Sequence, residues 1–235
     1  MSDPEPYREG RLSKPPEGGD YSCKKQFYRS AKVAEHYDAE RFLGVDKERR
    51  NRRKWATIRK ALAMTQEVEH VLDLPSGTGR FTGHLAREGY RVAAADISHE
   101  MMKIGCERVG AMENIRGHVQ AEAERLPFRD SAFDCVVSIR FLHHLDPDIR
   151  VGILREMARV ARWLVVDYRH RYSYHYARWK IRSWLGLTHK EMARVSRAQL
   201  EDELRRAGVR LHDVLSVTRI FSDKWIVVGE ASHDA

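Results

Sequence analysis

A tight turn with two glycines follows the first strongly apolar segment of the chain. The segment runs from Val68 to Leu74, the turn contains Gly77 and Gly79, and a helix is expected from Arg80. A strand, a glycine turn and a helix in this order bring backbone N–H groups close to a bound nucleoside or phosphate. The third glycine of a dinucleotide-binding turn would fall at Thr82, so the pattern favours a nucleoside over a pyrophosphate.

A carboxylate follows this turn in the sequence at the spacing expected for the end of the next strand. Asp96 ends a second apolar segment and lies nineteen positions after Gly77. A carboxylate at the end of the second strand accepts hydrogen bonds from ribose hydroxyls in nucleoside-binding sheets. The ends of two strands are therefore expected to converge on one nucleoside.

With the downstream segment Phe133 to Ser138, these motifs make the chain resemble the class I S-adenosylmethionine-dependent methyltransferases, in the small-molecule group called UbiE-like or type 11. The resemblance covers roughly residues 26 to 168 and implies S-adenosylmethionine as the cofactor. In that family, residues at the positions of Asp73 and the glycine turn surround the methionine part, and the residue at Asp96 binds the ribose.

Glu122 resembles the family's acidic residue that reaches the adenine amino group. It lies in the segment Gln120 to Phe128, which is similar to the family pattern D-A-x-x-L-P-F with Glu in place of Asp. Pro75 departs from the family, which usually has a glycine there, and proline has no N–H to donate. The cofactor-binding residues implied by the resemblance are Asp73, Pro75, Gly77, Gly79, Asp96, Ile97, Met101, Glu122, Ala123 and Ser138.

Residues for the methyl acceptor are expected in the loops at the carboxyl ends of the later strands, where open parallel sheets bind ligands. The segment Leu142 to Leu145 is similar to a histidine pair of the UbiE-like group, in which one histidine faces the acceptor. The catalytic candidates are His144, His143 and Arg140. The substrate-binding candidates are Tyr28, Tyr37, Tyr168, Arg169, Tyr172, Arg178 and Arg182. No third ligand accompanies the adjacent histidines at metal spacing, so no metal site is expected.

Alternating strand and helix patterns predict an α/β fold with a doubly wound, mostly parallel seven-stranded sheet. Only residues 219 to 224 separate the last two expected strands, and so short a link requires an antiparallel C-terminal hairpin. This is the Rossmann-like methyltransferase fold. The expected strands are 68–74, 91–96, 115–120, 133–139, 162–167, 209–218 and 225–228, and the expected helices are 26–42, 47–62, 80–88, 99–109, one beginning at Pro147, 171–185 and one from Arg197 to Gly208.

Two of these helices carry functional alternatives. The helix at 47–62 is rich in Lys and Arg and is expected to be a solvated face packed through Trp55, Ile58 and Leu62, or else a nucleic-acid contact. The helix at 171–185 either packs its aromatic side chains on the sheet or covers the substrate. As a cover it would present cations and aromatic rings to an anionic acceptor or a membrane surface.

The length and composition indicate one domain, and the resemblance implies a methyltransferase domain over 23–232, with N-terminal lid helices at 23–62 and a substrate cover at 169–190. Residues 1–22 hold four of the seven prolines and are expected to form a disordered tail. Neither an export signal nor a membrane span is apparent, which predicts a cytoplasmic protein. Three widely spaced cysteines suggest reduced thiols.

The sequence therefore predicts in-line methyl transfer from S-adenosylmethionine to a small, anionic or lipid-like acceptor. The net charge of +8 also fits an RNA methyltransferase acting on tRNA or rRNA, but no additional RNA-binding module is apparent. A catalytically silent cofactor-binding module is the third alternative. Peripheral membrane contact is the further partner that the aromatic and basic helix indicates.

Overall fold

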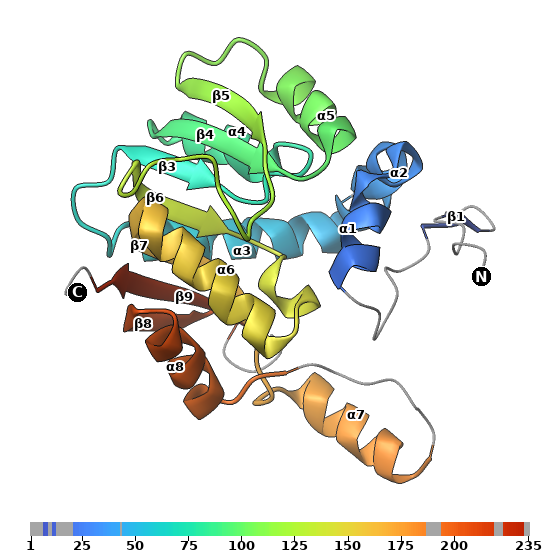
Figure 1. Cartoon of the computed structure of the whole chain (residues 1–235). Helices are drawn as coiled ribbons and strands as arrows, with labels where there is room; N and C mark the ends of the chain where they lie inside the picture. The colour runs from blue at the N-terminus through green and yellow to red at the C-terminus, as the bar shows by residue number, and fades with distance from the viewer. Residues whose placement is uncertain are drawn as a thin grey trace. The chain divides into compact units, whose positions relative to one another are not determined.

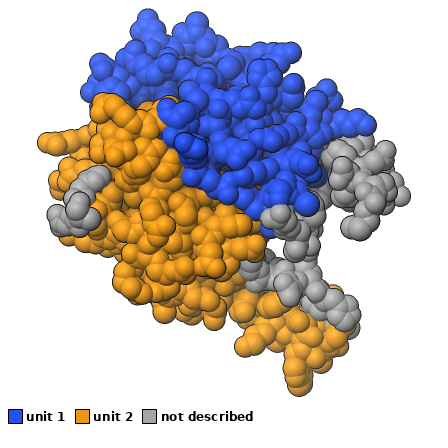
Figure 2. Space-filling view, in the orientation of Figure 1, with its two compact units in different colours: residues 1–52, 69–127 blue, residues 53–68, 128–235 orange. Residues whose placement is uncertain are grey.

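The computed structural model describes residues 7–8, 11–12, 21–42, 44–186, 194–218 and 223–232. These residues divide into two compact units, each made of two stretches of chain (Figure 2). Unit 1 consists of residues 1–52 and 69–127, and unit 2 consists of residues 53–68 and 128–235. Because the chain passes from one unit to the other more than once, neither unit is a contiguous segment.

Unit 1 contains a parallel sheet in which β4 lies between β3 and β5 (Figure 1). Its sheet strands and connecting helices are β3 (His70–Asp73), α4 (Arg80–Arg87), β4 (Arg91–Asp96), α5 (His99–Val109) and β5 (Ile115–Gln120). Val71 and Leu72 of β3 are fully buried and lie opposite Val92 and Ala93 of β4. The alternation of strands and helices thus produces the parallel pairs that the sequence predicts.

The N-terminal part of unit 1 forms two helices where the sequence predicts one. α1 (Tyr21–Arg29) and α2 (Ala31–Phe42) are separated at Ser30, whose carbonyl accepts the first backbone bonds of α2 from Val33 and Ala34. Serine favours helix starts over helix interiors, which accounts for the break. Val33 and Ala34 are buried with Met101 of α5, so α2 packs against α5.

Two features of the structure differ from the disordered tail that was expected at residues 1–22. Two short strands, β1 (Tyr7–Arg8) and β2 (Arg11–Leu12), pair antiparallel, and α1 begins within the tail at Tyr21. Lys25 lies over the Tyr21 ring at 4.7 Å from its centroid, a cation–π contact that fastens this first turn. The other residues of the tail lie outside the described part of the chain.

Unit 2 contains a mixed sheet in the order β6-β7-β9-β8. Its main elements are β6 (Phe133–Ser138), the 3-10 helix η1 (Leu142–His144), α6 (Pro147–Val160), β7 (Ala161–Arg169), α7 (Tyr174–Trp184), α8 (Arg197–Arg206), β8 (Val209–Ser216) and β9 (Lys224–Ala231). β6 and β7 are parallel, whereas β9 runs antiparallel to both β7 and β8. The predicted C-terminal hairpin is thereby confirmed.

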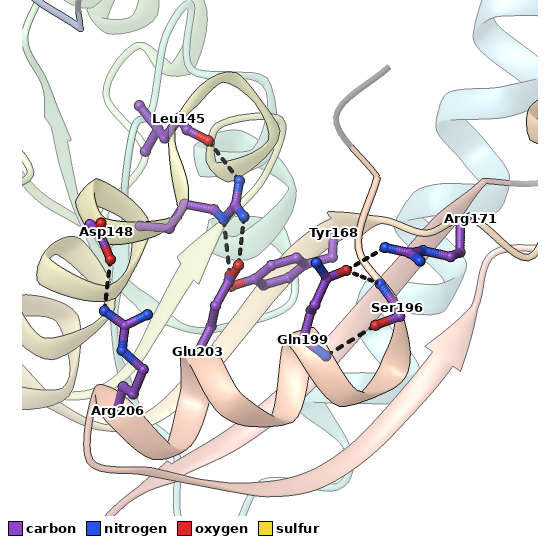
Figure 3. A network of polar contacts seen from close by, with 9 residues as sticks. Leu145, Asp148, Tyr168, Arg171, Ser196, Gln199, Glu203 and Arg206 are labelled. Carbon is purple, nitrogen blue, oxygen red and sulfur yellow. Dashed lines mark hydrogen bonds and ion pairs between the residues drawn. The ribbon is translucent and has the colours of Figure 1, made fainter. Parts of the chain in front are cut away.

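A buried polar network fastens α6 and α8 to β7 (Figure 3). The Arg150 guanidinium donates to both oxygens of Glu203, at 2.9 and 2.5 Å, and to the carbonyl of Leu145 at 2.6 Å. The Tyr168 hydroxyl donates to Glu203 Oε2 at 3.0 Å. At the start of α8, Ser196 and Gln199 form a capping box. Both oxygens of Glu203 are hydrogen-bonded, and this bidentate geometry offsets the cost of burying the charges of Arg150 and Glu203.

α3 (Val45–Leu62) corresponds to the predicted basic helix, and most of its charged residues are exposed. Lys54 differs from this expectation, because only 3% of it is exposed. It lies on the same buried face of the helix as Ile58, Ala61 and Leu62. These residues recur at i, i+4, i+7 and i+8, the spacing of a buried helix face.

The two units together supply the seven sheet strands of the predicted α/β fold, three in unit 1 and four in unit 2. A helix connects the strands of each of the pairs β3–β4, β4–β5 and β6–β7, and β8 and β9 form an antiparallel hairpin, so the predicted fold class is confirmed. Within the described residues, no helix combines the length and the apolar character that crossing a membrane requires.

Candidate cofactor and acceptor sites

The glycine turn of unit 1 is shaped by close backbone contacts. Gly77 and Gly79 have φ angles of 53° and 71°, in the left-handed region where side chains are strained. A Cβ on Gly79 would lie 2.9 Å from the Cα of Gly105 in α5. Ser76 N donates to the carbonyl of Ala95 at 2.9 Å, which fixes the turn on the end of β4. A side chain at either position would therefore strain the turn, and at Gly79 it would also clash with α5.

Asp96 connects this turn to the start of α5. Its Oδ2 accepts from Gly77 N at 2.7 Å and its Oδ1 accepts from Ser98 N at 2.9 Å. Each carboxylate oxygen has a second lone pair, so both remain able to accept a ribose hydroxyl. Burial raises the pKa of Asp96, and the two backbone donors partly oppose that rise.

Asp73 ends β3 and is a second buried carboxyl group, with 1% of the residue exposed. Burial raises its pKa to about 7; the hydroxyl of Thr82, 2.6 Å from Oδ2, acts against this and the charge of Asp96 adds to it. Among the described residues no cation contributes to the pKa of either aspartate. S-adenosylmethionine carries an ammonium and a sulfonium charge, so this donor set fits the cofactor that the sequence implies.

The predicted adenine contact, Glu122, is held by the first helix. Lys25 Nζ donates to its Oε2 at 2.7 Å and Arg29 donates to its Oε1 at 2.9 Å, while 44% of its side chain stays exposed. Lys25 is hydrogen-bonded to Glu124 as well. The hydrogen bond from Lys25 is the main cause that lowers the pKa of Glu122. A carboxylate with these two cations keeps lone pairs for the adenine amino group.

Tyr21 is a residue of this site that the sequence reasoning missed, because it was placed in the expected tail. Burial raises the pKa of its hydroxyl, and the charges of Glu124, Glu122 and Asp96 add to the rise. The ring therefore lies beside the carboxylates proposed for the adenine and the ribose. An aromatic residue at the end of a Pro- and Gly-rich stretch was the only signal in the sequence.

The remaining unit 1 candidates lie around the same strand ends. Tyr28 and Tyr37 are half-buried and pack against the cluster of Val33, Ala34 and Met101. Ala123 is buried. Gln120 donates to the carbonyl of Ile97 at 3.1 Å. Pro75 follows a cis peptide bond between β3 and the glycine turn.

Helix α2 contacts the glycine turn directly. Asp38 Oδ1 accepts from the Thr78 hydroxyl at 2.7 Å, and its other oxygen is paired with Arg108 of α5. Arg108 also donates to the Thr78 carbonyl at 2.6 Å. The segment that resembles the family's lid is thus fastened to the turn by three polar contacts.

Unit 2 contains Ser138 and the three catalytic candidates. Ser138 is buried at the end of β6, and its hydroxyl has no hydrogen-bond partner among the described residues. Arg140 N donates to Asp167 Oδ1 at 2.6 Å, which fixes the loop after β6. His143 and His144 lie in η1 with ring centroids 4.0 Å apart.

The environment of His143 favours its neutral form. Burial is the main cause that lowers its pKa well below the ordinary value, and the charges of His144, Arg169, Lys54 and Lys224 lower it further. Its buried Nδ1 has no partner within the described part of the chain. A neutral imidazole can accept a proton or a hydrogen bond from an acceptor group.

A buried ion pair lies at the carboxyl end of β7 in the same unit. Lys54 Nζ is 2.7 Å from Asp167 Oδ2, and the two side chains are 4% and 3% exposed. Burial raises the pKa of Asp167, but Lys54 and Lys224 outweigh it and leave the pKa below its ordinary value. Lys54 and Lys224 were not among the site residues predicted from the sequence.

The predicted substrate contacts of unit 2 are distributed over different surroundings. Arg169 ends β7 half-buried, whereas Tyr168 points into the Arg150–Glu203 network on the opposite face of the strand. Tyr172 is 59% exposed and stacks near His170. Arg178 and Arg182 are exposed on α7.

Arg171 departs from the sequence expectation. The helix expected at 171–185 begins only at Tyr174, so Arg171 lies before α7 and not on it. It donates instead to Gln199 Oε1 at 2.6 Å, at the start of α8 (Figure 3).

Comparisons with known proteins agree with this geometry. A family described as "Methyltransferase domain" matches residues 71–163, which include the glycine turn, Asp96, Glu122 and η1. The ubiquinone/menaquinone biosynthesis C-methyltransferase UbiE of Pseudomonas fluorescens is 35% identical over 125 residues, 49% of this chain and 48% of that protein. UbiE of Pectobacterium carotovorum is 39% identical over 110 residues, 43% of each chain. The chain thus spans about half the length of these curated relatives.

A structural relative covers more of the chain. The crystal structure of magnesium protoporphyrin IX methyltransferase (ChlM) from Synechocystis PCC 6803 with bound SAH has a TM-score of 0.69 and 14% identity, over 90% of this chain and 99% of that one. At this identity the likeness concerns the fold alone. Residues 71–163 thus match the methyltransferase domain family, the chain is similar to UbiE over about half of its length, and its fold is similar to that of a methyltransferase.

Proposed function

We propose that this chain transfers the methyl group of S-adenosylmethionine to a small, anionic or lipid-like acceptor. The observation that carries the proposal is the pair of buried carboxylates, Asp73 and Asp96, on either side of a turn whose two glycines have left-handed backbone angles. When bound, S-adenosylmethionine supplies an electrophilic methyl group. The protein then has to bind the cofactor, orient the acceptor and exclude water.

In this proposal unit 1 binds the cofactor. Asp96 accepts the ribose hydroxyls while Gly77 N and Ser98 N hold its oxygens in place. Asp73 neutralises the positive charge of the methionine part. Glu122 accepts the adenine amino group, and Lys25 and Arg29 orient its carboxylate.

Residues of unit 2 are proposed to orient the acceptor and receive its proton. Arg140 is positioned through its backbone bond to Asp167, and η1 presents the two histidines. His144, or the neutral His143, takes the proton that the acceptor atom loses as its bond to the methyl carbon forms. Solvent can take this role where the acceptor ionises before transfer.

The names of the relatives support a small-molecule acceptor. UbiE is named for ubiquinone and menaquinone biosynthesis, and the structural relative for magnesium protoporphyrin IX. Both names refer to small organic molecules. The net charge of +8 is the observation that keeps an RNA acceptor as the second candidate.

α7 is proposed to contact an anionic membrane surface when the acceptor is lipid-like. Ile181, Trp184 and Leu185 are 59%, 85% and 54% exposed, and the helix carries Arg178, Lys180 and Arg182 without any acidic residue. Apolar and aromatic side chains beside basic ones are typical of helices that lie in the membrane interface. A cytoplasmic location stays a prediction from the sequence.

Calorimetry with S-adenosylmethionine tests the cofactor assignment. Replacing Asp96 with alanine removes hydrogen bonds to a charged acceptor and is expected to weaken binding by about 1.5–3 kcal/mol. Asp130→Ala, at an aspartate whose side chain is 78% exposed, is the matched control and should bind like the wild type. Equal affinities for all three proteins would count against the ribose assignment.

Transfer assays then separate the candidate functions. The wild type is incubated with methyl-labelled cofactor and, in parallel, with a lipid extract or with total tRNA and rRNA. Label in the lipid extract is expected. Label in RNA alone would replace the proposal by the RNA alternative, and tight cofactor binding with no transfer to either would favour a silent binding module.

A further inference from the structure

Four basic residues gather at one end of the unit 2 sheet: Lys54, Arg140, Arg169 and Lys224, called here the cationic cluster. Arg169 and Lys224 are directly opposite each other in the antiparallel pair of β7 and β9. Side chains at opposed positions share one face of a sheet and lie in contact range. Like charges at such positions are unfavourable unless something compensates them.

Asp167 brings the other two members to the same face. It lies two residues before Arg169 on β7, so its side chain points to the same side of the sheet. One oxygen is 2.7 Å from Lys54 Nζ and the other accepts from Arg140 N at 2.6 Å. Both oxygens of this carboxylate are therefore already engaged.

The members of the cluster also lie close enough for their charges to act on one another. Asp223 is the other carboxylate that acts on Arg169, and it is itself paired with Arg194. Arg140 acts on Lys54, Arg169 and Lys224, and Asp167 acts on the last two with the opposite sign. The charge of Lys54, followed by burial, lowers the pKa of Lys224 to about 7. Burial also lowers the pKa of Lys54 and Arg169.

Two buried polar atoms in these surroundings have no hydrogen-bond partner in the part of the chain that the structure describes. They are Arg169 Nε and His143 Nδ1. Arg169, Lys54 and Lys224 are among the charges that act on His143, which places the imidazole beside the cluster. Buried polar groups are normally satisfied, and an Nε–H without a partner indicates a ligand with an acceptor oxygen.

The location is also that of a ligand site. Arg140 follows the end of β6, Arg169 is the last residue of β7, and Lys224 is the first residue of the antiparallel β9. All three therefore lie at the carboxyl edge of the parallel strands, outside which open α/β sheets bind their ligands. Each of them is half-buried and retains exposed surface.

We propose that the cationic cluster binds a compact oxyanion, a carboxylate or phosphate group of the methyl acceptor. Arg169 donates through its guanidinium, and Lys224 and Arg140 supply charge. The buried Lys54–Asp167 pair holds the strand ends in position. The anionic group would thus be bound by the sheet of unit 2, whereas the sequence suggested Arg178 and Arg182 of α7. That the anion belongs to a methyl acceptor rests on the proposed function, but binding of an anion at this site can be tested without transfer activity.

The test measures the reactivity of the Lys224 amine in the full chain. Its apparent pKa is obtained from the pH dependence of trace acetylation, followed by peptide mass spectrometry. The protein in chloride buffer is titrated with inorganic phosphate and, separately, with acetate. An oxyanion beside the ammonium favours its charged form, so the pKa of Lys224 is expected to rise by about one unit or more. Lys60, which is exposed on α3, should not change.

Two variants make the result specific. Arg169→Gln should abolish the response of Lys224 to phosphate. Arg162→Gln changes an exposed arginine near the other end of the same strand and should leave that response intact. A response to phosphate alone assigns a phosphate-bearing acceptor, and a response to acetate alone assigns a carboxylate. A response to both supports a general oxyanion site.

The inference is overturned if neither anion changes the reactivity of Lys224, or if Arg162→Gln removes the response as fully as Arg169→Gln. Calorimetry with S-adenosylmethionine on the same samples separates the two proposals. Cofactor binding without an anion response refutes the anion site alone. An anion response without cofactor binding refutes the methyltransferase proposal and leaves an anion site of other use.

Discussion

Asp73 gives a pH dependence to cofactor binding. Its pKa is raised to about 7, chiefly by burial, and no cation among the described residues counters that effect. A cationic ligand favours the carboxylate and must displace the proton. Affinity for S-adenosylmethionine should therefore be constant above about pH 7.5 and weaken by up to about tenfold for each pH unit below 7.

Titration calorimetry between pH 5.5 and 8.5 measures this slope, and Asp73→Asn is the control. The asparagine variant should bind more weakly at pH 8 and lose the slope, since it has no proton to displace. Without ligand, the pH dependence that Asp73 gives to the folding stability has the opposite sign. A folded pKa above the unfolded one means that the stabilising contribution of Asp73 is full below pH 4 and lost as the pH rises through 7. A slope that persists in Asp73→Asn would assign the titration to another group.

Residue-scale prediction from sequence succeeded where a backbone constraint determines the residue. Gly77 and Gly79 were identifiable because their turn has left-handed backbone angles, and Asp96 because its spacing from that turn follows from one strand–helix–strand unit. Lys54 was not identified. A run of basic residues is normally a solvated face, and its single buried member is distinguished only by sharing the stripe of Ile58 and Leu62.

Among the elements, α7 differs from the other helices of unit 2 in what it exposes. Figure 1 shows it apart from the strands β6 to β9 of its own unit. Tyr176 and Trp179 contact each other with ring centroids 5.2 Å apart, whereas Trp184 is 85% exposed. The sequence predicted an amphipathic helix here, but its burial could not be predicted, because the same aromatic pattern also suits packing on a sheet.

We expect α7 to bind vesicles that contain anionic lipid. Transfer of a Trp and an Ile side chain into the interface is favourable by roughly 1.5–3 kcal/mol each, and each basic residue adds about 1 kcal/mol at low salt. Sedimentation with vesicles of phosphatidylglycerol and phosphatidylcholine should retain the protein at low salt and release it at high salt. Ile181→Ser with Trp184→Ser should weaken this binding at least tenfold.

Val45→Ser is the matched control, since Val45 is 79% exposed on α3 and lies outside α7. It should bind vesicles as the wild type does. Equal retention on pure phosphatidylcholine, or retention of the double variant, would remove the membrane role from α7 and leave its apolar side chains unassigned.

At the scale of the whole molecule, the fold class could be predicted and the two compact units could not. Helix and strand periods and the six-residue link before β9 determine the element order and the hairpin. The units arise from long-range packing: residues 53–68 group with residues 128–235, although the chain between them belongs to unit 1. No local pattern signals that grouping.

The two units are nevertheless expected to unfold as one. α3 is a single helix from Val45 to Leu62 that continues across the boundary between residues 52 and 53. Unit 2 consists of two separate stretches of chain, which only the intervening residues of unit 1 connect. Unfolding of either unit thus disrupts a helix and the chain connections of the other, which favours a cooperative transition.

Hydrogen exchange with and without S-adenosylmethionine tests this cooperativity. At a free ligand concentration of about 100 times Kd, the folded state gains about 2.7 kcal/mol, so amides that exchange only through global unfolding should slow about a hundredfold. We expect the slowest amides of β4 in unit 1 and of β9 in unit 2 to slow alike, although the proposed cofactor residues belong to unit 1. Asp96→Ala at the same ligand concentration should lose most of both effects, because its affinity is lower. Slowing confined to β4 would show that the units unfold separately and that cofactor binding stabilises only the unit that contains Asp73 and Asp96.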